Sequence, residues 1–424
     1  MKLLIIDPDI SLVSPSMKGV IRSFPEIRQA GFEIEVWCWR CDDGVDPHHV
    51  VRLPVLGARL LGPLQAIVFS ILVTLRAFWV FQILGRPQPD VTFSLVPYLS
   101  RCDVAHAQFS PWDWENRMSA MGSRTPKEWL ERAANLIIRC WTNWFVCTTR
   151  ARSIIVPSDA VAEDFRRATD RASIEVLPNS YDPARFNLET RERWRAPQRR
   201  ALGYGDDDRV FIFVSTGHYR RKGFFLAVKA IEKLRLNHPH ARLLVVGGVP
   251  RTLDRLKQRL GVDHPGWEEW LHFTGSTNTP EQFMAAADAF LFPSWSEALA
   301  LVEIEAAACG LPLFLTHHHG SEMVLENGVN GSLIDFDPDH MAKTLDRFLT
   351  GEWKPQQATL KRALDRDTYA AALVNVLRSA ASRTRMSAQP PSASHSVGIP
   401  LGVPPLGGHA TKSPDAPSLK RIHS

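Results

Sequence analysis

The sequence predicts an α/β protein with two domains, each built around a parallel β-sheet. Short apolar runs bounded by Gly, Pro or polar residues alternate along the chain with longer stretches of helical pattern. Such runs are typical of strands buried on both faces of a parallel sheet, and their alternation with helices indicates helices on both sides of that sheet. A chain of 424 residues has room for about two to three domains of ordinary size.

The composition is that of an ordinary globular protein. Hydrophobic residues make up 45% and charged residues 22% of the chain, and the mean hydropathy of -0.14 argues against many membrane-spanning helices. The formal charge of +5 is spread along the chain, so we expect no nucleic-acid-binding arm, whereas a weak attraction to anionic lipid or phosphate fits this charge. The six cysteines are expected to be thiols in a reducing compartment.

Residues 1–190 are expected to form the first domain. Its predicted strands are Lys2–Asp7, Glu33–Trp39, Asp90–Leu95, Asp103–Gln108, Ser153–Pro157 and Ile174–Pro178. Its predicted helical stretches are Ser16–Ala30, Leu60–Leu84, Lys127–Thr148 and Asp159–Thr169. The opening run MKLLIID is short and is followed by acidic residues, so we interpret it as a buried strand rather than a signal peptide.

The stretch Leu60–Leu84 is apolar enough to resemble a membrane span. Arg76 lies between its two apolar segments, AIVFSILVTL and AFWVFQIL. A charge at the centre of a span costs about 2.5–3.5 kcal/mol on insertion scales. The sequence therefore favours a buried or interfacial helix, including one that lies on a membrane, over a helix that crosses it.

The second domain is predicted at 208–354. It is preceded by Asn187–Asp208, a charged segment without a core pattern, which we interpret as a linker. The predicted strands of this domain are Val210–Ser215, Ala241–Val246, Leu271–Thr274, Ala289–Phe292 and Leu311–Leu315.

After the second domain the chain changes character. Residues 365–383 have a helical pattern. Residues 386–424 are rich in Pro, Ser, Gly and Ala, hold 7 of the 30 prolines and contain no Phe, Trp or Tyr. A segment of this composition buries too little apolar surface to offset its ordering entropy, so we predict a disordered tail.

The segment Phe292–Gly310, FPSWSEALALVEIEAAACG, carries paired glutamates just after a predicted strand. If a helix begins near Ala298, Glu297 lies at its N-terminus and Glu305 about two turns further on. Ligands of open α/β sheets bind at this end of the strands. Without a ligand, the alternative is that Glu297 interacts favourably with the helix dipole and that Glu305 is exposed to solvent. Glu305, however, lies in an otherwise apolar run, and together the two carboxylates could contact two parts of one extended ligand.

A cationic turn follows the first strand of the second domain, in the sequence VSTGHYRRKGFF. Arg220, Arg221 and Lys222 stand between that strand and a helix that begins after Gly223. Cations beside free backbone N–H groups at a strand-to-helix turn are suited to a diphosphate. A plain solvated basic turn is the alternative for this motif in isolation.

Several segments together resemble the retaining, metal-independent family-4 glycosyltransferases of GT-B fold. They are STGHYRRKGFFLAVKAI, LLVVGG, LHFTGSTNTPEQFMAAADAFLFPS, EALALVEIEAAACGLPLF and GSEMVLENGVNGSLI, in this order. Glu297 and Glu305 match the family's glutamate pair with seven intervening residues. The motif GHYRRKG and a long helical insert at Trp129–Arg152 are most similar to bacterial lipopolysaccharide core glucosyltransferases. The resemblance spans Met1–Arg383 and is strongest from Ser173 onward.

The resemblance implies a GT-B architecture, with two Rossmann-like domains facing each other across a cleft. The first domain would be the acceptor side and the second would bind the nucleotide sugar. The helix at 365–383 could return to the first domain. Arg221 and Lys222 would hold the donor diphosphate, Glu297 would contact the donor sugar and nearby phosphate, and Glu305 would contact the ribose hydroxyls.

The resemblance also marks two residues of the first domain. His106, in DVAHAQF, falls where many members keep an active-site histidine facing the sugar; a satisfied core histidine is the alternative. Gly19 lies near the family's glycine-containing loop close to the diphosphate. The chain departs from the family where Ala298 and Leu299 follow the first glutamate, and where His218 replaces a common arginine.

The implied reaction transfers a sugar from a nucleotide-diphosphate donor, with UDP-sugars favoured, to a hydroxyl acceptor. The acceptor would be a cell-surface glycan or glycolipid such as lipopolysaccharide. The resemblance also implies that the anomeric configuration is retained and that the reaction needs neither a metal nor a cofactor. Trp112, Trp114 and the tryptophans of the helical insert could stack on a sugar, sit at a lipid interface or belong to a core. A cytoplasmic protein is expected, with peripheral contact at the inner face of the cytoplasmic membrane left open.

Two other classes of protein are alternatives to a glycosyltransferase. A non-catalytic sugar-nucleotide binder or assembly partner of the same fold is compatible with the departures from the family motifs. A dinucleotide-dependent oxidoreductase is disfavoured because G-x-G-x-x-G after the first strand is absent. Cys38 and Cys41 lack the context of a redox motif, and His317–His319 is expected to be a polar loop bordering the cleft rather than a metal site.

Overall fold

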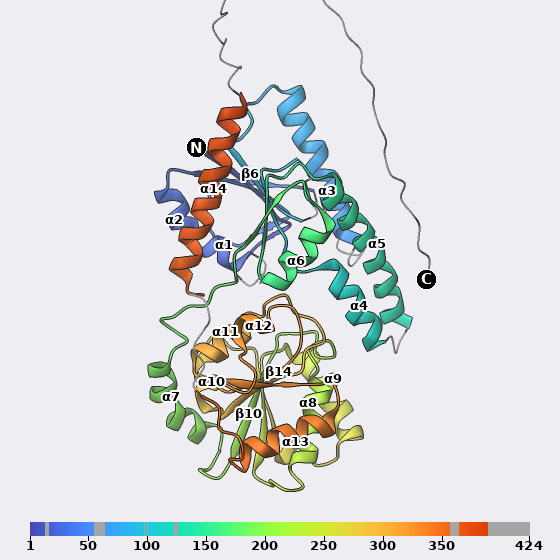
Figure 1. Ribbon diagram of the computed structural model, residues 1–424, viewed down its shortest axis with the longest axis vertical. Helices are drawn as coiled ribbons and strands as arrows, with labels where there is room; N and C mark the ends of the chain where they lie inside the picture. Colours follow the sequence, from blue (N-terminus) through green and yellow to red (C-terminus); the bar gives the residue numbers. More distant parts are fainter. Residues whose placement is uncertain are drawn as a thin grey trace, which may run out of the picture. The chain divides into compact units, whose positions relative to one another are not determined.

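The computed structural model describes residues 1–12, 17–54, 64–96, 98–99, 101–122, 126–356 and 364–388. Nearly all of the tail predicted at 386–424 lies outside these residues, as do the first residues of the helices predicted at 16–30 and 60–84. The described chain contains two large parallel sheets with helices on both faces, in agreement with the predicted α/β class (Figure 1).

The first sheet has seven parallel strands. In spatial order they are β5 (His49–Arg52), β3 (Glu33–Cys38), β1 (Lys2–Ile6), β6 (Val91–Leu95), β7 (Val104–His106), β8 (Ser153–Val156) and β9 (Ser173–Val176). Alternate residues of β1 enter different cores: Leu3 and Ile5 pack on one side of the sheet, and Leu4 and Ile6 on the other. Strands with two apolar faces therefore account for the continuous apolar runs in the sequence.

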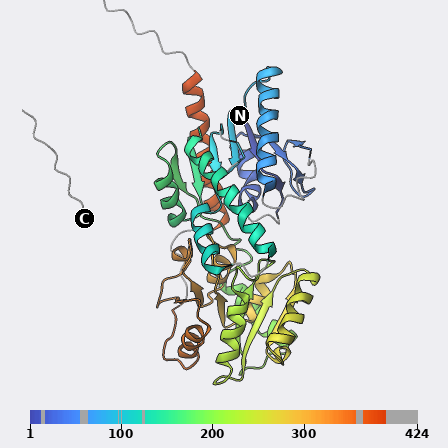
Figure 2. The same cartoon turned by 90° about the vertical axis from the view of Figure 1, so that its right-hand side faces the viewer.

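Helices cover both faces of this sheet. The core that contains Leu3 and Ile5 is closed by α1 (Lys18–Arg22), α2 (Phe24–Gln29) and α14 (Arg366–Ala388). Residues of α14 such as Tyr369 and Leu373 are buried there, so the C-terminal helix packs on the first sheet (Figure 1). The opposite core is closed by α3 (Gln65–Ala77), α5 (Pro126–Thr148) and α6 (Asp159–Ala168). The π-helix η2 (Phe78–Ile83) continues α3, and both are light blue in Figure 2.

The second sheet has six parallel strands around a single core. In spatial order they are β12 (Leu271–Gly275), β11 (Ala241–Val246), β10 (Arg209–Val214), β13 (Ala289–Phe292), β14 (Leu313–Thr316) and β15 (Gly331–Ile334). Its helices are α8 (Phe224–Leu234), α9 (Pro250–Asp263), α10 (Pro280–Ala286), α11 (Leu301–Ala308), α12 (Ser321–Val324) and α13 (Pro338–Leu349). This is a doubly wound sheet whose strand order reverses between β10 and β13.

The segment interpreted as a linker contains a helix, α7 (Leu188–Ala201). It has few apolar residues, and its arginines attach it to the end of α10 instead. Arg195 donates to the carbonyl oxygen of Ala287 at 2.8 Å, and Arg199 lies 3.3 Å from the carboxylate of Asp288. Guanidinium groups thus satisfy carbonyl groups that a helix C-terminus leaves free. A pattern search for apolar periodicity cannot detect a helix held in this way.

The predicted strands of both domains agree with the strands of the structure to within two residues at each end. The short strands β5 and β15 were not predicted, nor was α4 (Pro111–Met121). This helix begins with Pro111 after Ser110, whose side chain accepts a hydrogen bond from the backbone N–H of Asp113. Ser followed by Pro is a helix-start signal, so the sequence did carry the information for α4.

Candidate functional site

The candidate site lies where the strand order of the second sheet reverses. Two loops leave the carboxyl ends of the neighbouring strands β10 and β13. The loop after β10 carries Arg221 and Lys222, and the loop after β13 carries Glu297. Crossover helices run in opposite directions from such a point and leave a crevice there, which is where ligands bind in doubly wound sheets.

A close approach of the two backbones holds these loops together. Gly223 has a φ of +76°, and a Cβ atom at this position would lie 1.9 Å from the carbonyl oxygen of Pro293. The N–H of Trp295 donates to the carbonyl oxygen of Arg221 at 2.8 Å. Only glycine fits between the loops, so Gly223 fixes the position of the cationic turn relative to Glu297.

Arg221, Lys222 and Glu297 form a compact charged group. Nη1 of Arg221 lies 2.9 Å, and Nζ of Lys222 lies 3.8 Å, from Oε1 of Glu297. The hydroxyl of Ser294 donates to the same oxygen at 3.1 Å. Burial acts to raise the pKa of Glu297, but the charges of Lys222 and Arg221 outweigh it and hold that pKa below its ordinary value. Glu297 is therefore a carboxylate at neutral pH.

One donor of this group has no partner among the residues that the structure describes. Nε of Arg221 is buried and makes no hydrogen bond to any described residue, although Nη1 of the same side chain contacts Glu297. The guanidinium carbon also lies 5.3 Å from the centre of the Trp114 ring of α4. An unsatisfied buried donor next to a lysine is a position where an anionic ligand would be stabilised.

Behind this group lies a buried ion pair that the sequence interpretation missed. Glu303 and His318 are both 0% exposed, and Nε2 of His318 lies 3.0 Å from Oε1 of Glu303. Nδ1 of His318 lies 3.0 Å from the carbonyl oxygen of His319, which can only accept, so Nδ1 carries a proton. Burial acts to lower the pKa of His318, but Glu303 raises it to about 9. His318 thus adds positive charge near Glu297.

The loop His317–His319 was expected to be polar and to border the cleft. His318 is instead buried, whereas His319 reaches the first half of the chain. Its Nδ1 lies 3.1 Å from Asp113 of α4, and its Nε2 lies 3.1 Å from Asp164 of α6. Within the described part of the chain, no group of three or more His, Cys, Asp or Glu side chains is arranged to hold a metal ion.

Glu305 lies in α11, the helix that follows the loop carrying Glu297. The helix α11 begins at Leu301, not near Ala298, so Glu297 lies in the preceding loop and Glu305 is only about one turn into the helix. The expectation that both glutamates share one helix was wrong. Glu305 is 7% exposed; burial raises its pKa to about 7, opposed by the charges of Lys18 and Arg185. Ligand hydroxyls that donate to this carboxylate would favour its ionised form.

His106 ends β7, at the carboxyl edge of the first sheet, but it is buried with 1% exposure. Burial lowers its pKa to about 4, so the imidazole is neutral at pH 7. Its Nε2 contacts the side-chain amide of Gln108, and its Nδ1 has no partner among the described residues. Gln108 lines a pocket of about 280 Å³ together with Arg221 and Glu297. His106 therefore lies one side chain away from this pocket.

Gly19 has a packing reason to be glycine. It lies within α1, and a Cβ atom there would be 3.0 Å from the Tyr369 ring of α14. The structure therefore does not require a ligand to explain this glycine. Two residues of α1, its neighbour Lys18 and also Arg22, carry charges that act on Glu305 and oppose the rise of its pKa.

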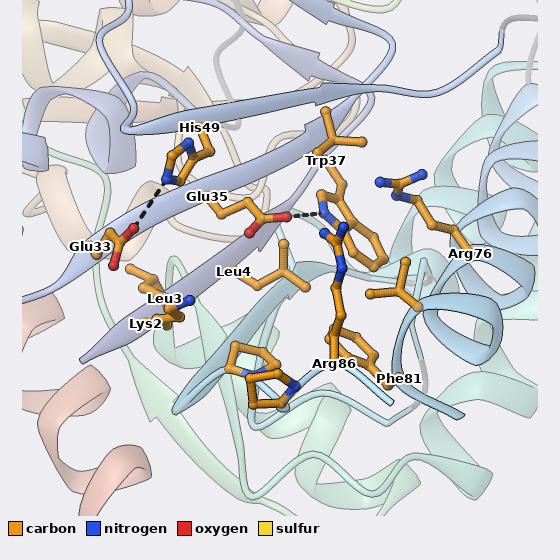
Figure 3. Close-up of a pocket in the computed structure, with 14 residues that line it drawn as sticks. Lys2, Leu3, Leu4, Glu33, Glu35, Trp37, His49, Arg76, Phe81 and Arg86 are labelled. Atoms are coloured by element: carbon orange, nitrogen blue, oxygen red, sulfur yellow. Dashed lines mark hydrogen bonds and ion pairs between the residues drawn. The ribbon is translucent and has the colours of Figure 1, made fainter. Parts of the chain in front are cut away.

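A second pocket, drawn in Figure 3, contains none of the predicted site residues. It lies beside the first residues of β1 and β3, Lys2 and Glu33. Arg76 is placed with its guanidinium carbon 5.1 Å from the centre of the Trp37 ring. Ligands of parallel sheets bind at the carboxyl ends of the strands, and this pocket lies at the amino ends. We therefore place the candidate site at the second sheet.

Comparison with known proteins shows which family the second half of the chain resembles. Residues 195–366, which include Arg221, Lys222, Glu297 and Glu305, match the family described as Glycosyl transferases group 1. The lipopolysaccharide glucosyltransferase WaaG of Escherichia coli is 27% identical over 207 residues, which are 47% of this chain and 54% of that protein. The chain spans about half the length of the curated relatives that it matches.

Solved structures show that the fold is GT-B. The crystal structure of WaaG, described as a glycosyltransferase involved in lipopolysaccharide biosynthesis, has a TM-score of 0.60 at 18% identity and covers 90% of this chain and 95% of its own. Anabaena HepE, solved in complex with UDP and glucose, has a TM-score of 0.56 at 17% identity and covers 91% and 99%. The predicted fold and the resemblance to lipopolysaccharide core glucosyltransferases are confirmed.

Proposed function

We propose that this protein is a glycosyltransferase that moves a sugar from a nucleoside diphosphate donor to a hydroxyl group. The observation that carries the proposal is the gathering of Arg221, Lys222 and Glu297 at the reversal point of the second sheet, with Glu305 in the helix that follows. Two cations for a diphosphate and two carboxylates for hydroxyl groups are the contacts that a nucleotide sugar needs.

The chemistry of the donor explains why the cations matter. Breaking the bond between sugar and phosphate builds negative charge on the departing diphosphate and positive charge on the sugar ring. Arg221 and Lys222 would stabilise the diphosphate, and the unsatisfied Nε of Arg221 offers a further donor. Glu297, which is ionised, would accept hydrogen bonds from the sugar. In the proposed mechanism, protein cations take the place of a metal ion. We also propose that the anomeric configuration of the sugar is retained.

His106 has an indirect place in the proposal. It is buried and neutral, and it contacts Gln108, which lines the pocket that contains Glu297. We assign it the task of orienting the Gln108 amide toward the bound sugar. We assign Gly19 no contact with the donor. Because it has no side chain, α1, which carries Lys18, can pack close to α14.

UDP-sugars are the proposed donors, and a lipopolysaccharide or related glycolipid is the proposed acceptor. The structure of HepE with UDP and glucose and the name of WaaG support these two choices respectively. The alternative is a non-catalytic sugar-nucleotide binder of the same fold. An assay of UDP-glucose turnover distinguishes the enzyme from the binder. A non-catalytic binder would bind UDP but would neither hydrolyse UDP-glucose nor transfer its sugar under any condition.

A thermal-shift screen of nucleoside diphosphates and their sugars tests the proposed function. A ligand at about 100 times its Kd stabilises the folded protein by about 2.7 kcal/mol, so UDP or UDP-glucose should raise the melting temperature measurably, and more than ADP or GDP. The proposal fails if no nucleoside diphosphate or nucleotide sugar changes the melting temperature.

We also propose that the protein works at the inner face of the cytoplasmic membrane, held there by α3 and η2. Gln65–Ile83 is long and apolar enough to cross a bilayer. One face of it, however, packs in the core through Phe69 and Val73. The other face exposes a stripe whose members are each 48% to 61% exposed: Ile71, Leu75, Phe78, Trp79, Ile83 and Leu84. A helix with one buried and one exposed apolar face is suited to lying on a membrane.

Replacing Trp79 with glutamate is expected to weaken binding to vesicles of phosphatidylethanolamine and phosphatidylglycerol by about tenfold or more, because a buried aromatic side chain contributes about 1.5–3 kcal/mol. Co-sedimentation measures this binding. Leu236→Glu is the matched control, since Leu236 is 84% exposed and lies outside α3 and η2. Equal binding of the two variants would contradict the assigned surface.

A further inference from the structure

A cationic pocket of about 580 Å³ lies next to the candidate site and is not explained by it. Its lining includes five arginines: Arg132 of α5, Arg220 and Arg221 of the cationic turn, and Arg255 and Arg259 of α9. Among the side chains that the structure describes, Glu115 is the one acidic residue that lines it. These five guanidinium groups outnumber the carboxylates that pair with them, Glu115, Glu297 and Asp263, so the described lining carries an excess of positive charge, which attracts anions.

Part of this charge is not neutralised by neighbouring residues. Arg132 lies 3.7 Å from Glu115, and Arg259 lies 3.1 Å from Asp263. Arg255 makes no ion pair or hydrogen bond with another described residue. Thr252, Arg255 and Arg259 recur every three to four residues, so they face the pocket from one side of α9. The pocket thus presents an arginine ready to bind an anion beside a hydroxyl donor.

The remaining walls are aromatic. Trp114 of α4 and Phe225 of α8 line the pocket, and each lies under a guanidinium group. The Arg221 carbon is 5.3 Å from the centre of the Trp114 ring, and the Arg259 carbon is 4.3 Å from that of Phe225. Flat apolar surfaces framed by cations are suited to a sugar ring that carries an anionic substituent.

The cationic pocket continues into the pocket around Glu297. The two share Trp114, Asn135 and Arg221. Lys222 and Glu305, the proposed contacts of the donor diphosphate and ribose, do not line it. A ligand in the cationic pocket would therefore be next to the donor rather than in its place.

We propose that this pocket binds the acceptor, and that the acceptor carries a phosphate group recognised by Arg255 and Arg259. This inference rests on the proposed glycosyltransferase function, because it places the acceptor relative to the donor site. It deepens that function by defining the acceptor as a phosphorylated carbohydrate. Arg132 and Arg220 hold the wall of the pocket, since Arg220 donates to the carbonyl oxygen of Gly122 at 2.9 Å.

Glucose 6-phosphate serves as the probe, titrated into the full chain with UDP already bound. We expect the wild type to bind glucose 6-phosphate more tightly than glucose. Arg255→Gln and Arg259→Gln should each weaken this binding about tenfold, because each removes a charge-assisted contact to phosphate. Arg251→Gln is the matched control: Arg251 is also exposed on α9 but does not line the pocket, and its loss should change the affinity less than twofold.

The outcomes separate this inference from the proposed function. Equal effects of Arg255→Gln and Arg251→Gln, or no binding of glucose 6-phosphate to the wild type, would overturn the phosphate site. Binding of glucose 6-phosphate in the absence of UDP but not in its presence would overturn it as well, since the pocket would then belong to the donor. UDP affinity should be the same in the wild type and all three variants. Failure of UDP to bind the wild type would instead refute the proposed function itself.

Discussion

Replacing Lys222 with alanine is expected to lower the turnover of sugar transfer by about a hundred- to a thousandfold, the effect of removing one donor that stabilises a developing anion. Nζ of Lys222 lies 3.8 Å from Glu297 and 5.1 Å from the centre of the Phe292 ring, so the ammonium group is fixed at the reversal point of the sheet. Initial rates of UDP release from UDP-glucose in the presence of acceptor measure the effect.

The fold should survive this change. Lys222 keeps part of its side chain in solvent, and Arg221 still pairs with Glu297 at 2.9 Å. We therefore expect the free energy of unfolding to fall by no more than about 1 kcal/mol. Lys229→Ala is the matched control, because Lys229 is exposed on α8. Wild-type turnover in Lys222→Ala would contradict the diphosphate role of this lysine.

Replacing His318 with leucine is expected to lower the free energy of unfolding by about 3–5 kcal/mol, the usual cost of leaving one member of a buried ion pair alone. His318 and Glu303 are both 0% exposed, so water cannot replace the lost partner. Urea denaturation followed by circular dichroism measures the change.

The double variant Glu303→Leu, His318→Leu is the control for this prediction. It removes both charges, and replacing a buried ion pair with apolar residues is often close to neutral. The double variant should therefore recover most of the stability that the single variant loses. If both variants were equally unstable, the cost would lie in packing, and the account of Glu303 and His318 as a charge pair would be wrong.

The sequence located the residues at the ends of β10 and β13 because topology determines where they lie. The sequence placed Arg221, Lys222 and Glu297 after predicted strands, and the family resemblance grouped them; the structure adds that β10 and β13 are neighbours, so the loops after them meet. The close approach of the two loops at Gly223, which has a φ of +76°, cannot be detected by pattern analysis of the sequence.

The pairing of Glu303 with His318 could not be predicted in the same way. It depends on the rotation of α11, which is set by the residue at which the helix begins. The apolar run after Glu297 suggested a start near Ala298, whereas residues up to Ala300 are in the loop. Each residue of an α-helix is rotated by about 100° from the one before it. An error of three residues in the predicted start therefore changes which carboxylate is expected to face the core. The apolar neighbours of Glu303 were the available signal.

The sequence left open whether His106 faces the cleft or is a buried core histidine, and the structure shows it buried. Its place at the end of β7 was predicted, but the end of a strand contains both inward and cleft-facing positions. The contact with Gln108 and the ring of Phe93, whose centre is 5.5 Å away, is decided by how neighbouring strands pack. The same holds for the cationic pocket, because Arg132 and Arg255 come from α5 and α9, which are far apart in the chain.

The most direct test of the central claim is a crystal structure of the full chain with UDP. The account predicts the diphosphate within hydrogen-bonding distance of Lys222 and Arg221, with the ribose hydroxyls donating to Glu305. UDP bound elsewhere, for example in the pocket of Figure 3, with Lys222 and Glu305 untouched, would contradict it.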